Sequence, residues 1–147
     1  MIPGFDDDGN LPAGIHTATW GEIVSRFGTT PYRRGLLNGL RTGIEMLANA
    51  GCQMVYLDGS FVSSKPIPGD FDACWESDGV DPNLLDPVIL NFANGRAAQK
   101  AKYRGEFFIA GIQEQGSGKL FVEFFQVDKN TGKPKGVVAI DLRRLNS

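Results

Sequence analysis

Two aspartates one residue apart, Asp70 and Asp72, are the residues whose type and spacing point most directly to chemistry. They open a short apolar run that ends at Trp75, a pattern typical of a β-strand. Because strand side chains alternate between two faces, both carboxylates are expected on the same face. Neighbouring carboxylates raise one another's pKa, and a bound cation relieves the repulsion. Carboxylate oxygens suit Mg²⁺, with substrate phosphates completing its shell, so the pair predicts a magnesium site.

A glycine and a serine, Gly59 and Ser60, end the apolar run that precedes this pair. Nine residues separate Ser60 from Asp70, and Lys65 lies among them. Backbone N–H groups at a strand end can hold phosphate, and a serine hydroxyl adds another donor. A lysine ammonium nearby adds positive charge. We therefore predict that Gly59, Ser60 and Lys65 bind phosphate groups beside the metal.

A metal site that works on phosphate commonly needs a third carboxylate, and Glu123 is the first candidate. It stands among apolar neighbours in the run Leu120–Phe125, where a charge requires a partner or access to water. The alternatives are that Glu123 faces solvent or pairs with an arginine, and Asp141 is then the substitute. A shared site requires the third carboxylate to lie within about 5 Å of the aspartate pair.

Other chemistry has less support in the sequence. Ser60 is not set in the G-x-S-x-G pattern of a nucleophile elbow, and the one histidine, His16, lies far from it near the N-terminus. The segment Arg96–Arg104 carries four basic residues. It is expected either as a solvated helix face or as a group that neutralises a triphosphate or an RNA backbone.

The composition is that of an ordinary globular chain of 147 residues with a formal net charge of −2. This charge argues against a general affinity for nucleic acid. Cys52 and Cys74 lie in apolar runs and are expected to be buried thiols. The acidic start does not resemble a signal peptide, and no apolar run approaches the roughly 20 residues of a membrane span. We therefore expect a cytoplasmic protein without membrane contact.

The order of the helices and strands expected to position these residues predicts an α+β fold, with helices packed on a mixed or antiparallel sheet. Thr19 and Glu22 have capping-box spacing for a first helix. Residues 1–18 are expected as an extended lead-in to one domain that spans residues 1–147, and the C-terminal strands as an antiparallel meander. The expected helices are 20–27, 31–50, a short stretch within 83–92, and 96–104, and the expected strands are 53–57, 70–75, 106–112, 120–127 and 137–142.

The pattern Leu57-Asp58-Gly59-Ser60, nine residues, Asp70-Phe71-Asp72 resembles the signature of the nucleotidyltransferase superfamily related to DNA polymerase beta. More narrowly, it resembles the minimal nucleotidyltransferases of bacteria, and the whole chain resembles a small bacterial and phage-associated branch. The resemblance implies a nucleotidyltransferase-like fold. It also implies that Gly59 and Ser60 contact nucleotide phosphates, that Asp70 and Asp72 bind Mg²⁺, and that a third acid on a later strand corresponds to Glu123.

The function implied by this resemblance is Mg²⁺-dependent transfer of a nucleoside monophosphate from a nucleoside triphosphate, with ATP the expected nucleotide. The acceptor would be a protein or an RNA. Minimal nucleotidyltransferases of this size often belong to toxin–antitoxin or phage-defence pairs, which implies a partner protein by analogy. The alternative is a catalytically inactive binding module with the same fold, acting as an antitoxin-like or regulatory partner.

Overall fold

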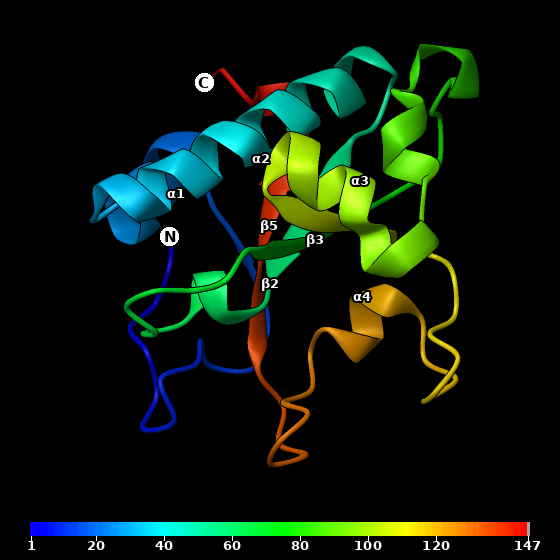
Figure 1. Cartoon of the computed structure of the whole chain (residues 1–147). Helices are drawn as coiled ribbons and strands as arrows, with labels where there is room; N and C mark the ends of the chain where they lie inside the picture. Colours follow the sequence, from blue (N-terminus) through cyan, green and yellow to red (C-terminus); the bar gives the residue numbers. More distant parts are fainter. Residues whose placement is uncertain (147) are drawn as a thin grey trace.

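A five-stranded mixed sheet organises the chain in the computed structural model, which describes residues 1–146 (Figure 1). The strands lie in the order β1-β5-β2-β3-β4. β2 is antiparallel to both of its neighbours, whereas the outer pairs β1–β5 and β3–β4 are parallel. The strand bounds are β1 Gly14–Thr17, β2 Met54–Asp58, β3 Phe71–Trp75, β4 Gly105–Ile109 and β5 Gly136–Asp141. The α+β class and the mixed sheet predicted from the sequence are confirmed.

Two helices form as their caps and apolar spacing predict. Thr19 and Glu22 form the reciprocal capping box at the start of α1 (Trp20–Phe27). The Thr30 side chain caps α2 (Pro31–Asn49), with proline in its first turn. The remaining helices are α3 (Ala93–Tyr103) and the single turn α4 (Phe121–Phe124). No helix among residues 1–146 is both long and apolar enough to cross a membrane.

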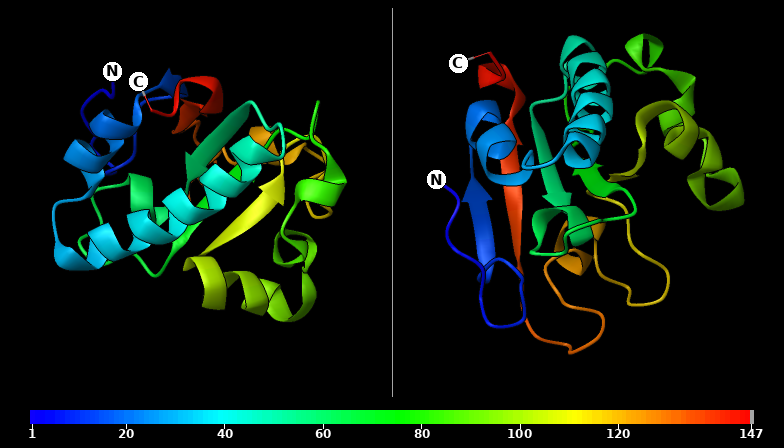
Figure 2. Two further views of the ribbon diagram at one scale, coloured as in Figure 1. Left: turned by 90° about the horizontal axis from the view of Figure 1, so that it is seen from above. Right: turned by 60° about the vertical axis from the view of Figure 1, so that its left-hand side comes forward.

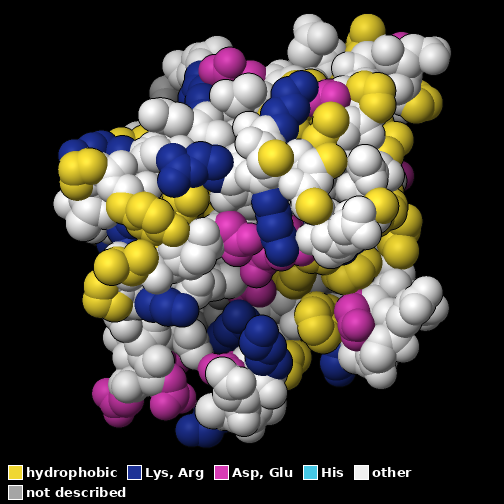
Figure 3. All heavy atoms as spheres, viewed as in Figure 1, with side chains coloured by type: hydrophobic (Ala, Val, Ile, Leu, Met, Phe, Trp, Pro, Cys, Tyr) yellow, Lys and Arg dark blue, Asp and Glu magenta, His cyan; other side chains and the backbone are white. Residues whose placement is uncertain are grey.

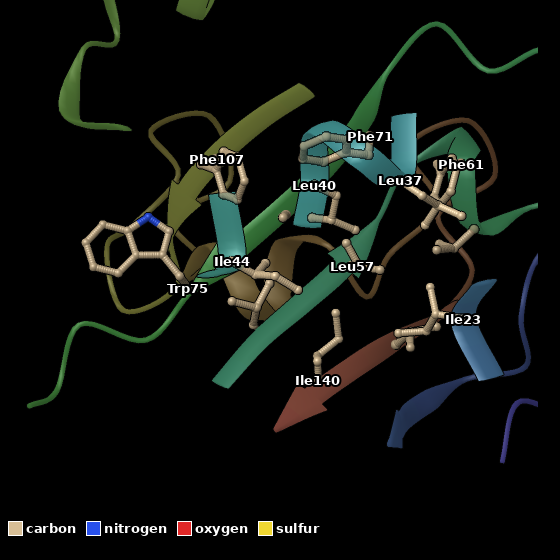
Figure 4. Close-up of a cluster of buried hydrophobic side chains, with 14 of the residues drawn as sticks. Ile23, Leu37, Leu40, Ile44, Leu57, Phe61, Phe71, Trp75, Phe107 and Ile140 are labelled. Atoms are coloured by element: carbon tan, nitrogen blue, oxygen red, sulfur yellow. The ribbon is translucent and has the colours of Figure 1, made fainter. Parts of the chain in front are cut away.

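The main core lies between α2 and one face of the sheet (Figures 2 and 4). Leu40 and Ile44 of α2 are fully buried against it. On the strands, alternate residues such as Leu57, Phe71 and Phe107 point to this face. Because side chains alternate, the residues between them point to the opposite face. A smaller cluster with Tyr56, Cys74, Phe125, Val137 and Ala139 occupies that second face. Both cysteines are free and buried, as the sequence predicts.

The outer edge of β4, the last strand of the sheet, is covered by side chains of α3. The buried Gln99 accepts a hydrogen bond from the Phe107 N–H at 2.7 Å and donates to the Ile89 carbonyl at 2.9 Å. Arg96 Nε donates to the Phe107 carbonyl at 3.1 Å. These bonds satisfy an edge strand that would otherwise offer its backbone to another chain.

Several expected elements differ from the observed ones. The strand predicted over residues 120–127 is wrong, since Phe121–Phe124 form a helical turn, from which Phe121 and the following Phe125 pack on Phe108. The antiparallel meander is also wrong, because β4 runs parallel to β3 and β5 inserts between β1 and β2. The lead-in contains β1, and two 3-10 turns, Pro82–Leu84 and Pro87–Leu90, replace the short helical stretch.

Candidate functional site

Three carboxylates converge at one end of the adjacent strands β3 and β4. Asp70 immediately precedes β3, Asp72 lies on β3, and Glu106 is the register partner of Asp72 on the parallel strand β4. One oxygen from each carboxylate lies within 4.8 Å of the others. Figure 3 shows acidic side chains gathered in a hollow near the middle of this face, with basic side chains above and below. We refer to Asp70, Asp72 and Glu106 as the carboxylate triad.

A fourth carboxylate lies next to Asp72 and is paired with a lysine. Asp58 ends β2 and is the register partner of Asp72 across the antiparallel pair. It is almost fully buried, and its Oδ1 lies 3.0 Å from the ammonium of Lys135, which directly precedes β5. Burial raises the pKa of Asp58, and Lys135 opposes that rise. Asp58 therefore has a cationic partner within the protein, and it is not one of the three carboxylates that come together.

The electrostatics of the triad favour a bound cation. Burial, then the charges of Glu106, Asp70 and Asp58, raise the pKa of Asp72 to about 7. Burial also raises the pKa of Asp70, against the effect of Lys100. All three donors are carboxylate oxygens, the ligands that Mg²⁺ prefers. A divalent cation would stabilise the ionised form of each, so the donor set fits Mg²⁺.

The basic residues near the triad differ in part from those expected. Lys100 Nζ lies 3.5 Å from Glu106 Oε1, and Arg96 lies close enough to Glu106 and Asp72 for their charges to affect its pKa. Lys65 is exposed, and its ammonium forms no ion pair with any residue of the range 1–146. The cations that approach the carboxylates thus come from α3 and from the segment before β5.

Gly59 and Ser60 follow β2 directly, and Gly59 lies against the triad. Its φ is +83°, a left-handed conformation that side chains disfavour. A Cβ at this position would lie 2.6 Å from Asp72 Oδ2. Ser60 opens a 3-10 turn, Ser60–Val62, and its carbonyl accepts from the Ser63 hydroxyl at 2.6 Å. The glycine is therefore required by the close approach of the backbone to a carboxylate of the triad.

The change Gly59→Ala tests this contact. We expect it to weaken Mg²⁺ binding at least tenfold, because the new methyl group displaces Asp72, and to destabilise the fold by about 1–3 kcal/mol. Isothermal titration calorimetry and urea unfolding measure the two effects. Gly132→Ala is the matched control, since Gly132 has a φ of +73° and no atom lies within 4 Å of the place that its new methyl group would take. Equal Mg²⁺ affinity in both variants would contradict the expectation.

A buried arginine holds the loop that follows Ser60. The Arg33 side chain on α2 is 5% exposed. Its guanidinium donates to the carbonyls of Phe61 at 2.8 Å and Ser63 at 3.3 Å, and also to that of Lys65. The charge is thus satisfied by backbone dipoles. Arg33 fixes the path of the chain between β2 and β3.

We expect Arg33→Met to destabilise the protein by about 3 kcal/mol, because it leaves several carbonyls without donors. Hydrogen exchange of residues 60–65 should increase strongly, whereas that of the strands should change little. Urea unfolding and exchange mass spectrometry provide the measurements. Arg34→Met is the control, since Arg34 is exposed and makes one bond, to the Gly28 carbonyl. Unchanged protection of residues 60–65 would show that another group holds the loop.

Neither residue proposed as the third acid joins the triad. Glu123 is exposed on α4, where its Oε1 accepts a hydrogen bond from the Leu120 N–H at 3.2 Å. Asp141 is opposite Met54, at the other end of β2 from Asp58, and binds Arg143 at 2.9 Å. The third carboxylate is Glu106, which the sequence places at the start of an expected strand without a function assigned to it. The signal for Glu106 in the sequence is that an acidic residue begins this expected strand.

By its fold and site, the chain is an α+β protein with a carboxylate triad at one end of a mixed sheet. The model of a family of unknown function, DUF6932, matches residues 3–141, and the chain belongs to this family. No curated protein and no solved structure matches the chain. The family match provides no link to the nucleotidyltransferases.

Proposed function

We propose that this protein is a Mg²⁺-dependent nucleotidyltransferase that moves a nucleoside monophosphate from a nucleoside triphosphate to a hydroxyl group. The observation that carries the proposal is the triad on two adjacent strands, with Gly59 packed against Asp72. The order α2, β2, Gly59-Ser60, β3 with its two aspartates, and a neighbouring acid on β4 supports the nucleotidyltransferase-like fold that the sequence implies. ATP is the expected nucleotide, and a protein or an RNA the expected acceptor.

Asp70, Asp72 and Glu106 would hold the metal. When bound, Mg²⁺ supplies neutralisation of the charge on the triphosphate and on the phosphoryl group in transfer. Gly59 lets the backbone pass close to Asp72, and the Ser60 hydroxyl that follows it can donate to a phosphate held at the metal. Lys100 and Arg96 add fixed positive charge on the opposite side of the triad. Lys65, in the loop that Arg33 anchors, retains its proposed contact with the terminal phosphates.

The reaction is an in-line displacement. The acceptor hydroxyl oxygen forms a bond to the α-phosphorus, and the bond from that phosphorus to the bridging oxygen of the β-phosphate breaks. Pyrophosphate leaves with the electron pair of the broken bond. The hydroxyl proton passes to the Glu106 carboxylate, which takes the place proposed for Glu123. Electrostatic stabilisation of the transferred group carries most of the rate enhancement.

A partner is also part of the proposed function. The acceptor, or a partner subunit, is proposed to complete the substrate site, because all three carboxylates of the triad are partly exposed. A toxin–antitoxin or phage-defence pair is the proposed setting.

A transfer assay tests the function. The protein is incubated with Mg²⁺, cell extract and each of the four nucleoside triphosphates labelled at the α-phosphate, beside a variant that combines Asp70→Asn with Asp72→Asn. We expect label to reach protein or RNA with wild type only. Asp78→Asn is the matched control, because Asp78 is an exposed aspartate outside the triad.

The outcomes separate the two classes of function. Mg²⁺-dependent nucleotide binding without transfer would favour the catalytically inactive binding module. Neither binding nor transfer in wild type would overturn the proposed function. Transfer that persists in the double variant would place the chemistry elsewhere.

A further inference from the structure

A surface pocket of about 250 Å³ lies beside the triad, at the edge of the sheet beyond β4. It is formed by the start of α3 and by the segment that connects β4 to α4. Figure 3 shows hydrophobic side chains next to the acidic hollow on this face. Phe92 and Ile112, both in the pocket wall, are 44% and 49% exposed. The pocket also contains Arg96, Gln113, Gln115 and Phe121.

Arg96 is held in this wall by an unusual local conformation. Asn94, Gly95 and Arg96 have φ values of 54°, 61° and 61°, a left-handed turn within α3 that non-glycine residues rarely adopt. Strained backbone of this kind persists where the surrounding structure fixes it. Here the Arg96 Nε binds the Phe107 carbonyl, and the guanidinium carbon lies 3.9 Å from the centroid of the Phe108 ring and 4.7 Å from that of Phe92.

The polar groups of the pocket have capacity to bind a ligand. Within residues 1–146, no carboxylate lies within 4 Å of the Arg96 guanidinium, and its two terminal nitrogens make no hydrogen bond. The side-chain amides of Gln113 and Gln115 are likewise without hydrogen-bond partners in this part of the chain. A guanidinium that stacks on aromatic rings, together with amides that both donate and accept, is suited to a planar, hydrogen-bonding ring.

The position of the pocket relates it to the triad. Phe108, on which Arg96 stacks, follows Glu106 by two residues on the same face of β4, about 7 Å along the strand. Gly59 and Ser60 lie on the other side of the triad, at the end of β2. A ligand with its phosphates held at the triad, next to Gly59, would therefore extend across β3 and β4 towards the pocket.

We propose that this pocket binds the nucleobase of the nucleoside triphosphate, with Phe92 stacking on the ring and with the terminal nitrogens of Arg96 and the Gln113 amide binding its edge. The proposal rests on the proposed function, because it takes the phosphates of the same nucleotide to lie at the triad. It adds that base selectivity comes from α3 and from the segment between β4 and α4. Stacking on an aromatic ring tolerates any base, so Gln113 at its edge is the residue expected to discriminate.

Binding measurements with and without the base test this assignment. Calorimetry in Mg²⁺ compares the four nucleoside triphosphates with inorganic tripolyphosphate, which has the charge but no base. We expect Phe92→Ala and Gln113→Ala to raise the Kd of the preferred nucleotide about tenfold and to change that of tripolyphosphate less than twofold. Leu84→Ala and Gln53→Ala are controls, since both residues are exposed and lie outside the pocket. Unchanged nucleotide affinity in the pocket variants would overturn the proposal.

Further arms separate this failure from failure of the proposed function. Nucleosides without phosphate, added to isotope-labelled protein, are expected to shift the NMR amide signals of residues 92–96 and 109–121. Such shifts without Mg²⁺-dependent binding of tripolyphosphate would support the pocket and overturn the proposed function. The opposite result is tripolyphosphate binding that Asp72→Asn abolishes, with no NMR shifts on addition of nucleosides. It would support the proposed function and overturn the pocket as the nucleobase site. If Phe92→Ala weakens binding of a single-stranded RNA but not of any nucleotide, the assignment to the triphosphate is overturned.

Discussion

Asp72→Asn is expected to stabilise the metal-free protein at pH 8 and to abolish its Mg²⁺-dependent nucleotide binding. Burial and three neighbouring acids raise the pKa of Asp72 from 3.8 to about 7. The folded state therefore holds this proton more tightly than the unfolded state. Ionisation of Asp72 costs stability as the pH rises from about 4, and the full cost is reached above about pH 7. Asparagine cannot ionise, so the variant avoids this cost.

The size of the effect follows from the pKa. One pKa unit corresponds to about 1.4 kcal/mol, so a pKa moved from 3.8 to about 7 corresponds to roughly 4 kcal/mol at most. Partial exposure of the site reduces this value. We expect the stability of Asp72→Asn relative to wild type to increase by about 2 kcal/mol between pH 4.5 and pH 8. Urea unfolding in EDTA at the two pH values measures it.

Mg²⁺ should reverse the order of stability. A ligand that binds only the folded state stabilises it according to its concentration and Kd, and only wild type keeps the complete triad. Asp78→Asn, at an exposed aspartate outside the triad, should follow wild type in both conditions. If the stability difference between Asp72→Asn and wild type is the same at both pH values, ionisation of Asp72 does not destabilise the folded protein.

The elements that local sequence specifies were predicted well. The capping box of Thr19 and Glu22 marks the start of α1, and the apolar spacing along Pro31–Asn49 gives α2. β2 and β3 follow from short apolar runs bounded by turn residues. These signals depend on neighbours within one or two turns, so a single sequence contains them.

The third carboxylate depends on contacts that are distant in the chain. Glu106 reaches Asp72 because β4 pairs with β3 in parallel, with α3 and two 3-10 turns between them. No local pattern specifies this register. The sequence favours Glu123 because an acid in a strand-like apolar run requires a partner or access to water. The same run forms a helical turn, from which Phe121 and the following Phe125 pack on Phe108. The explanation for Glu123 is a hydrogen bond at the start of that turn.

Glu106→Gln is expected to lower the rate of nucleotide transfer by about 100-fold or more, whereas Glu123→Gln should change it less than twofold. The glutamine has nearly the same shape as Glu106 but lacks the charge that binds metal and accepts the proton, and loss of one such electrostatic group costs this much in comparable sites. Steady-state transfer with labelled nucleotide measures the rates. Calorimetry with Mg²⁺ gives a second readout, in which only Glu106→Gln weakens binding.

The ion pair between Lys100 and Glu106 requires its own control. Their atoms lie 3.5 Å apart, so Glu106→Gln also removes this contact. Lys100→Met removes the same pair and leaves all three carboxylates in place. The pair is partly exposed, so its loss should cost at most about 1 kcal/mol of stability. If Lys100→Met weakens Mg²⁺ binding as much as Glu106→Gln does, the lost contact and not the lost ligand explains the effect. If only Glu106→Gln weakens Mg²⁺ binding, the third acid of the site is Glu106. Glu123 has the same side chain but lies on α4 and does not reach the triad.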